Sequence, residues 1–380
     1  MAIHDFVIIG AGMAGASLGW QLASAGASVL LLEREAQPGY HSTGRSAALF
    51  IETYGTETIR ALTRASRAFY AAPPAGFADA PILGPRGVAY VATQGERAEL
   101  AALNAELRPH APDLVDLSPA ELLQRLPCLR PEVLAAGLLD PGATDIDVHA
   151  LHQGYLRGLR RHGAALRTDA EVTGMTRGDG LWCVALAQGE PVRARCVVNA
   201  AGAWADVVAR MAGARPIGLV PKRRSAFTFP APTGIDVQRW PAAIGVAENW
   251  YFKPDAGQLL GSPANADPTE PHDVQAEELD VATGIAHIEA VTTFTIRRPT
   301  HVWAGLRSFV ADGEFVIGED DTVEGFFWLA AQGGYGIQSA AGYSLLARNL
   351  LLKEPLDERL RAEGIAAAMA AALSPQRLRA

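Results

Sequence analysis

The chain has 380 residues, enough for one large domain or two, and 49% of them are apolar, enough to fill a sizeable core. Its 33 basic and 41 acidic residues give a formal net charge of −8 without long charged runs, which argues against a nucleic-acid partner or an anionic membrane surface. Cys128, Cys183 and Cys196 have the spacing of neither a disulfide framework nor a metal site. We therefore expect a soluble cytoplasmic protein with no metal and no transmembrane segment, whose partner is a small molecule.

The first predicted elements form a nucleotide-binding βαβ unit. A strand-forming run over 6–9 leads into Gly-Ala-Gly-Met-Ala-Gly, and a second apolar run ends on Glu33. Gly10 permits the tight turn, Gly12 lets the backbone approach a pyrophosphate, and Gly15 lets the next helix pack close to the sheet. The start of that helix directs free N–H groups at the phosphates. Glu33 lies near the expected spacing of about 20 residues after the first glycine, where it can bind ribose hydroxyls and disfavour NADP.

Periodicity and capping residues predict the elements that follow. Helices are predicted over 56–70, 95–107, from Ser118 and over 147–162, and strands over 87–93, 170–173, 182–187, 192–199 and 326–330. A second glycine-rich loop, 332–336, leads into a predicted helix from Ile337 to about Leu352 and offers another anion-stabilising terminus. The segment 196–204 breaks from a buried strand into small residues. It is either a place where backbone meets a cofactor or an ordinary strand-to-helix corner.

Two features predict a division into two domains. A proline-rich connection over 71–85 marks a departure from the nucleotide domain, and the pattern over 223–263 turns to antiparallel strands with a turn at 254–257. We predict an α/β fold in which an α+β substrate domain, built on a mostly antiparallel sheet, is inserted into a discontinuous Rossmann-type domain. The nucleotide domain is expected to comprise 1–80, 145–215 and 305–380, and the substrate domain 81–144 and 216–304.

With these pieces in order, the chain resembles the D-amino acid oxidase-like flavoprotein family, and within it the catabolic D-arginine dehydrogenases. The resemblance spans nearly the whole chain and is carried by 32–48, 221–227, 251–257, 303–307 and 331–338. It implies FAD rather than NAD as the dinucleotide. Related sarcosine-oxidase-like proteins attach flavin covalently through a cysteine just after the arginine that corresponds to Arg307, where this chain has Ser308. The resemblance therefore implies non-covalent FAD.

The glycine motifs and the resemblance together imply a set of FAD-binding residues. The segment Ser42 to Ala47 is expected to lie along the flavin, and the loop Gly333 to Gln338 to contact its pyrimidine end. The helix after that loop would stabilise negative charge on the reduced flavin. The full expected set is Gly10, Gly12, Met13, Ala14, Gly15, Glu33, Arg34, Ser42, Thr43, Arg45, Ser46, Ala47, Val172, Ala200, Gly202, Gly333, Gly334, Tyr335, Gly336, Ile337 and Gln338.

Two arginines and two tyrosines are the candidate catalytic residues. A guanidinium fork can fix an amino acid carboxylate with two parallel charge-assisted bonds, and Arg307 is the first candidate for this role. The resemblance implies that Arg224 also lies beside the substrate, that Tyr251 supplies a phenol to the carboxylate, and that Tyr54 closes over the pocket from a loop that Gly55 makes easy to hinge. Outside this family context, such residues are more often surface ion pairs or half-buried packing residues.

The expected substrate pocket departs from that of the D-arginine dehydrogenases. Leu49 and Ile51 stand where those enzymes place a histidine and a threonine. Those enzymes also place a glutamate, which receives a cationic side chain, in the strand after a Pro-Arg pair, where this chain reads Pro85-Arg86-Gly87-Val88. Losing that acid removes the partner that offsets desolvation of a guanidinium or an ammonium group, unless Glu52 restores the charge from elsewhere. The predicted pocket-lining residues are Leu49, Ile51, Val88, Ala242, Ile244 and Gly334.

These observations predict FAD-dependent oxidative deamination of D-amino acids with neutral or apolar side chains. A hydride would pass from Cα to flavin N5, and water would hydrolyse the imino acid to a 2-oxo acid and ammonia. No general base is required, because the neutral amine can assist hydride departure. The sequence leaves open whether the electron acceptor is oxygen or a quinone-type compound. Alternatives are oxidation of N-methyl or cyclic secondary amino acids or of 2-hydroxy acids, and a non-catalytic flavin-binding subunit.

Overall fold

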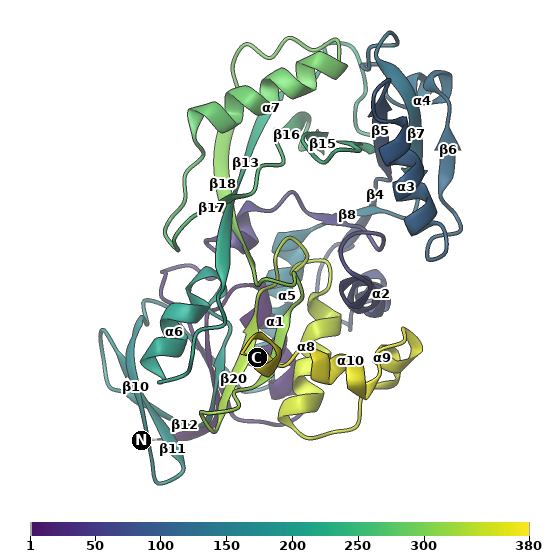
Figure 1. Ribbon diagram of the computed structural model, residues 1–380. Helices are drawn as coiled ribbons and strands as arrows, with labels where there is room; N and C mark the ends of the chain where they lie inside the picture. The colour runs from purple at the N-terminus through teal and green to yellow at the C-terminus, as the bar shows by residue number, and fades with distance from the viewer. Residues whose placement is uncertain (1, 380) are drawn as a thin grey trace.

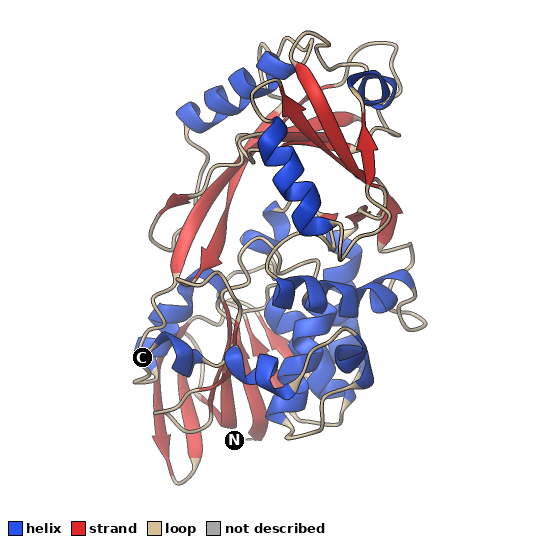
Figure 2. Ribbon diagram, turned by 45° about the vertical axis from the view of Figure 1, so that its right-hand side comes forward, coloured by secondary structure: helices blue, strands red, loops and turns tan. Residues whose placement is uncertain are grey.

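The fold contains two large β-sheets, one above the other in Figure 1, joined by a small three-stranded sheet. The structure is a computed structural model, and it describes residues 2–379. Figure 2 shows a group of helices on one side of the lower sheet. This arrangement confirms the predicted fold class of an α/β nucleotide domain with a mostly antiparallel second sheet.

The lower sheet has eight strands in the order β10-β11-β12-β1-β2-β9, with β20 paired to β12 and β19 to β20. The pairs among β20, β12, β1, β2 and β9 are parallel. The bounds are β1 Ile3–Ile9, β2 Val29–Leu32, β9 Ala165–Arg167, β10 Val172–Gly178, β11 Leu181–Leu186, β12 Val192–Asn199, β19 Val316–Glu319 and β20 Phe326–Ala330.

The second half of β1, residues 6–9, is apolar because it is buried on both faces of this sheet. Ile8 packs into one apolar cluster with Leu18 and Leu346, whereas Val7 and Ile9 pack into a second cluster on the opposite face. Successive side chains of a strand alternate between faces, so a strand covered on both sides must be apolar throughout. The helices that belong to this half are α1 Met13–Ser24, α2 Glu57–Ala71, α5 Val148–Arg161, α6 Ala205–Met211, α8 Ala340–Leu351, α9 Glu358–Ala362 and α10 Ala367–Ala372.

The upper sheet has nine strands in the order β17-β13-β16-β15-β14-β5-β7-β6, with β18 paired to β13. All pairs are antiparallel except β5 with β14. The strands are β5 Val88–Thr93, β6 Val115–Leu117, β7 Leu134–Asp140, β13 Val220–Pro230, β14 Ala242–Gly245, β15 Tyr251–Asp255, β16 Gln258–Ser262, β17 Asp267–Pro268 and β18 His301–Phe309. The helices of this half are α3 Arg97–Leu107, α4 Pro119–Arg125 and α7 Glu278–Val291.

The two halves meet at the small sheet of β3 (Leu49–Phe50), β8 (Thr144–Ile146) and β4 (Leu83–Pro85). The limits of the two predicted domains stay a prediction. β18 continues across the expected boundary between 304 and 305. No helix among residues 2–379 has the length and apolar character needed to cross a membrane.

The structure confirms most predicted elements and corrects several of their bounds. Thr56 caps α2 and Asp147 caps α5, and Ser118 forms a capping box with Glu121 at the start of α4. The strand predicted over 170–173 is wrong in its bounds, since β10 begins at Val172 and continues to Gly178. The strands around the predicted turn at 254–257 continue into it, so the turn itself is Ala256–Gly257.

The predicted start of the last long helix at Ile337 is also wrong. Residues 333–339 form turns, and α8 begins at Ala340. The cause is a side chain from α2. The Tyr70 hydroxyl donates to the Ile337 carbonyl at 2.6 Å and accepts the Ala340 N–H at 3.0 Å, so it satisfies groups that would otherwise begin the helix.

Candidate functional site

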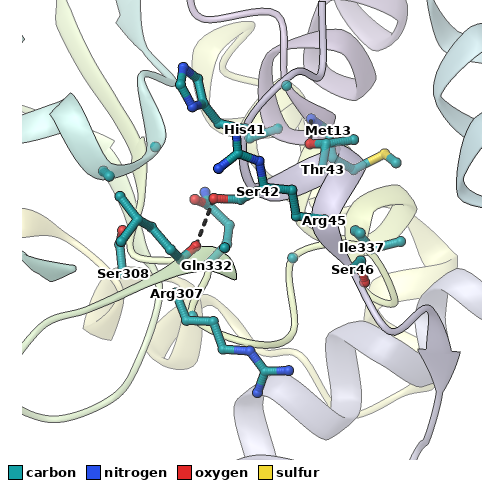
Figure 3. Close-up of a pocket in the computed structure, with 18 of the residues that line it drawn as sticks. Met13, His41, Ser42, Thr43, Arg45, Ser46, Arg307, Ser308, Gln332 and Ile337 are labelled. Carbon is teal, nitrogen blue, oxygen red and sulfur yellow. Dashed lines mark hydrogen bonds between the residues drawn. The ribbon is translucent and has the colours of Figure 1, made fainter. Parts of the chain in front are cut away.

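A cavity extends from the glycine motif of the lower sheet to residues of the upper sheet. Figure 3 shows some of the residues that line it. It is lined by nearly all of the predicted FAD-binding residues, and of that set only Gly15 and Tyr335 lie outside its lining. The four candidate catalytic residues line its other end. Sequence segments that are far apart therefore form one elongated site.

The backbone at the nucleotide end requires glycine at two positions. Gly10 has a φ of 102°, and a Cβ atom there would lie 2.4 Å from the Ala200 carbonyl oxygen. A Cβ atom on Gly15 would lie 1.9 Å from the Gly10 oxygen, so Gly15 packs α1 against the turn instead of lining the cavity. The Met13 N–H at the start of α1 donates to Thr43 Oγ1 at 3.0 Å.

The Glu33 carboxylate lies at the end of β2, where it holds the nucleotide loop together. Glu33 is 9% exposed, and its two oxygens accept the backbone N–H groups of Ala11 at 2.9 Å and Glu35 at 3.0 Å. Because the side chain also lines the cavity, its remaining lone pairs are available to ligand hydroxyls.

Replacing Glu33 with glutamine is expected to raise the FAD dissociation constant at least about tenfold. An amide keeps the shape but has one acceptor oxygen in place of two, and a charge-assisted hydrogen bond contributes about 1.5–3 kcal/mol. Flavin fluorescence during titration of the apoprotein measures this change. Glu35→Gln is the control, since its side chain pairs with Arg34 and lies outside the cavity lining. Equal affinity of parent and Glu33→Gln protein would contradict the assignment.

The segment predicted to lie along the flavin is anchored to the upper sheet. It forms a short 3₁₀ helix, η1 (Ser42–Arg45), in which Ser42 Oγ donates to the Leu306 carbonyl at 2.7 Å (Figure 3). Arg45 donates to the Ala304 carbonyl at 3.1 Å and to Asp273, and its hydrogen bond holds the pKa of Asp273 below the ordinary value. The cavity wall is therefore shared between the two halves of the protein.

One buried polar group beside this segment lacks a partner. Gln332 Nε2 forms no hydrogen bond with any residue in the range 2–379, although Gln332 lines the cavity as Ser42 does. A buried donor without a partner is costly, so a ligand acceptor in the cavity would satisfy it. This orphaned donor, the glycine cradle and the carboxylate at the end of β2 fit a dinucleotide such as FAD.

The two candidate arginines lie on neighbouring strands at the other end of the cavity. Arg307 on β18 pairs in register with Lys222 on β13, and Arg224 pairs with Gly305. Figure 3 shows the Arg307 side chain extending away from Met13 and Thr43. Gly334 leaves room for it, because a Cβ atom there would lie 2.9 Å from Arg307 Nη1.

The charges of these arginines are not neutralised by carboxylates. Neither guanidinium forms an ion pair within the described part of the chain, and Arg224 Nε donates to the backbone carbonyl of Asn265 at 2.5 Å. Burial and the Arg307 charge lower the pKa of Arg224. Burial also acts to lower the pKa of Arg307, but neighbouring phenols, Tyr54 foremost, raise it above the ordinary value. Two cations facing one cavity form a site for an anion.

Aromatic side chains surround this anion site. Tyr54 lies 4.8 Å from Tyr335, measured between ring centroids, so Tyr335 supports Tyr54 from behind. Tyr251 pairs in register with Ile244, which pairs with Tyr90, so that three side chains form a row across β15, β14 and β5. All three line the cavity. Burial raises the pKa of the Tyr90 and Tyr335 phenols, which therefore stay protonated donors.

Four predicted pocket residues line the cavity, namely Leu49, Ile51, Ile244 and Gly334. The prediction was wrong for Val88 and Ala242, which are 0% and 1% exposed and pack in the apolar cluster beneath Ile51 and Tyr90. They point to the same face as the cross-strand row but lie two residues before Tyr90 and Ile244 in their strands. Glu52 does not supply the missing acid either, since it pairs with Arg67 at 2.5 Å and does not line the cavity.

Tyr90, Glu248 and Gln332 are among the lining residues that sequence reasoning missed. Glu248 is an exposed acid between β14 and β15, where its φ of 51° places it in a tight turn. Its position three residues before Tyr251 was the available signal.

Comparison with known proteins identifies the class to which this fold and cavity belong. Residues 5–350 match the family model described as DAO, FAD dependent oxidoreductase. The chain belongs to this family of FAD-dependent oxidoreductases. It is 31% identical to mitochondrial dimethylglycine dehydrogenase of Rattus norvegicus over 211 residues, which is 55% of this chain and 24% of that protein. The chain thus spans about a quarter of the length of the curated relatives it matches.

Two solved structures support the fold. Glycine oxidase from Geobacillus kaustophilus superimposes with a TM-score of 0.81 at 21% identity, covering 93% of this chain and 96% of that one. L-proline dehydrogenase from P.horikoshii has a TM-score of 0.80 at 18% identity, covering 99% and 98%. The narrower resemblance to D-arginine dehydrogenases stays a prediction.

Proposed function

We propose that the protein oxidises D-amino acids with neutral or apolar side chains, using non-covalently bound FAD. The observation that carries the proposal is the pair of guanidiniums, Arg224 and Arg307, that face the cavity without a carboxylate partner among residues 2–379. The carboxylate of an amino acid supplies the missing charge. FAD, when bound, supplies the two-electron acceptor.

Each residue at this end of the cavity has a defined role in the proposal. Arg307 and Arg224 bind the carboxylate, and the phenols of Tyr251 and Tyr54 donate to it. This fixes the orientation of the substrate, which is the main contribution of the protein to the rate when no general base is used. Leu49, Ile51 and Ile244 form an apolar wall for the side chain. The imino acid product is hydrolysed by water to a 2-oxo acid and ammonia.

Across a panel of D-amino acids, neutral apolar side chains are expected to have kcat/KM values at least about tenfold above those of D-arginine and D-lysine. Burying a cationic group against Leu49 and Ile51 without a partner costs more than about 1.4 kcal/mol, which is tenfold in rate. Steady-state kinetics with an artificial acceptor measures the ratio.

The variant Glu248→Gln tests whether a cavity acid binds a cationic substrate side chain, because Glu248 lines the cavity. A parent enzyme that prefers D-arginine, and loses that preference in Glu248→Gln, would contradict the proposed specificity and assign the cationic side chain to Glu248.

A second candidate is oxidation of N-methyl amino acids, favoured by the similarity to the dimethylglycine dehydrogenases. It keeps the carboxylate site and differs only at the amine. Oxidation of N-methyl groups releases formaldehyde, whereas oxidation of a D-amino acid releases ammonia. Assaying both products with sarcosine, dimethylglycine and the D-amino acid panel separates the two candidates. A flavin that no amino acid reduces under anaerobic conditions would indicate a non-catalytic subunit.

A further inference from the structure

We infer that Asn265 and Asp280 are positioning residues that hold the Arg224 guanidinium in place for the substrate carboxylate. The inference rests on the proposed function, because it assigns a carboxylate to Arg224. Neither residue lines the cavity, so both act through the arginine.

The first observation is a gap in the edge of β13. Residues 227–230 of this strand pair with β16, and residues 222–223 pair with β17. Residues 263–266, which connect β16 to β17, form no strand against the part of β13 in between. Asn265 fills the gap with its side chain. Its Oδ1 accepts the backbone N–H of Ser225 at 2.8 Å, and its backbone carbonyl accepts Arg224 Nε at 2.5 Å. Asn265 therefore binds both the side chain of Arg224 and the backbone of the next residue.

The second observation is a partly buried carboxylate behind Asn265. Asp280 lies near the start of α7, and its side chain is 11% exposed. Its Oδ2 atom accepts from Asn265 Nδ2 at 2.9 Å and from Ser225 Oγ at 2.7 Å. The same oxygen accepts from Arg223 Nε at 2.8 Å. One carboxylate oxygen thus ties together three residues around Arg224, and charge-assisted bonds of this kind resist distortion.

The third observation is the kind of anchor that Arg224 receives. A backbone carbonyl restrains Nε without cancelling the positive charge, and it leaves both Nη atoms for a ligand. The charge of Arg307 faces the same cavity, so like-charge repulsion favours movement of an unanchored Arg224 away from it. The neutral Asn265 carbonyl, held in place through Asp280, therefore keeps the Arg224 guanidinium near that of Arg307 and leaves both charges available to a substrate carboxylate.

The variant Asn265→Ala tests this role in the FAD-loaded protein. The probe is propionate, a carboxylate without an amine, compared with its neutral isostere propionamide, and binding is followed by the change in flavin absorbance. Alanine keeps the backbone carbonyl that accepts from Arg224 but loses the side-chain bonds that hold this carbonyl in place. We expect the propionate dissociation constant to rise about tenfold to a hundredfold, which corresponds to the loss of one charged hydrogen bond between Arg224 and propionate, with propionamide binding unchanged. Crystal structures of parent and variant are expected to show the Arg224 guanidinium displaced. Asp280→Asn should change propionate binding in the same direction, and it replaces Asn265→Ala if that variant does not fold.

The matched control is Glu277→Gln. Glu277 also forms an ion pair with Arg223, but its side chain is 60% exposed, and the Asn265 amide donates to Asp267 and Asp280 instead. Its variant should bind propionate within about twofold of the parent, as expected for a surface substitution. A variant of Asn265 or Asp280 that holds FAD and binds propionate as tightly as this control would overturn the inference. If the parent holds FAD and binds no propionate, the proposed function fails. The crystal structures then test the positioning role by themselves, and an Arg224 guanidinium that is not displaced in Asn265→Ala overturns that role.

Discussion

Replacing Arg307 with methionine is expected to lower kcat/KM for the best D-amino acid about a hundred- to a thousandfold, with FAD still bound. Methionine fills the space but cannot form the two parallel bonds of a guanidinium, and removing one partner of a buried charge pair costs about 2–5 kcal/mol. Arg307 lies at the centre of the site, enclosed by Tyr54, Tyr251 and Gly334, so water cannot easily replace the lost donors. Steady-state kinetics, with the flavin spectrum as a measure of FAD content, checks the result.

Arg307→Lys is the informative control because it keeps the charge and loses the fork. An intermediate rate is expected, since a single ammonium attracts the carboxylate without fixing its orientation. If Arg307→Met retains FAD and its kcat/KM stays within about tenfold of the parent, Arg307 does not bind the substrate carboxylate, because a buried charge pair would cost more than that. Activity would then have to depend on Arg224 or on another part of the cavity.

The nucleotide end of the site could be predicted because each residue there has a local task. Gly10 makes a turn that other residues rarely adopt, and Glu33 lies at a fixed distance along one βαβ unit. The strand at 326–330 was confirmed to the residue, because burial on both faces leaves a continuous apolar run. The strand at 192–199 was also confirmed to the residue, although Arg193 and Arg195 interrupt its apolar pattern.

The substrate end could be predicted only in part, because its lining depends on strand pairing. Tyr90 reaches the cavity since β5 lies beside β14, a parallel neighbour about 150 residues later in the chain. No local pattern reveals that register, so Val88 was expected at the cavity and Tyr90 was not. The start of α8 was misjudged for a similar reason, because the hydroxyl that delays it comes from Tyr70, 270 residues before Ala340.

Replacing Gly10 with alanine is expected to raise the FAD dissociation constant at least about a hundredfold, because the added Cβ would need a conformation costing about 1–3 kcal/mol and a backbone shift costing a similar amount. The atom it would meet, the Ala200 oxygen at 2.4 Å, belongs to a buried backbone and cannot move like a flexible side chain. Gly26→Ala is the matched control, since Gly26 also has a positive φ of 89° but an added Cβ has no neighbour within 4 Å. Both variants carry backbone strain. Flavin titration measures FAD affinity, and a thermal unfolding curve measures stability. A loss of FAD affinity in Gly10→Ala alone would show that the close approach of the backbone after β1 to the backbone after β12 forms the nucleotide site. Equal FAD affinity in the two variants would contradict it.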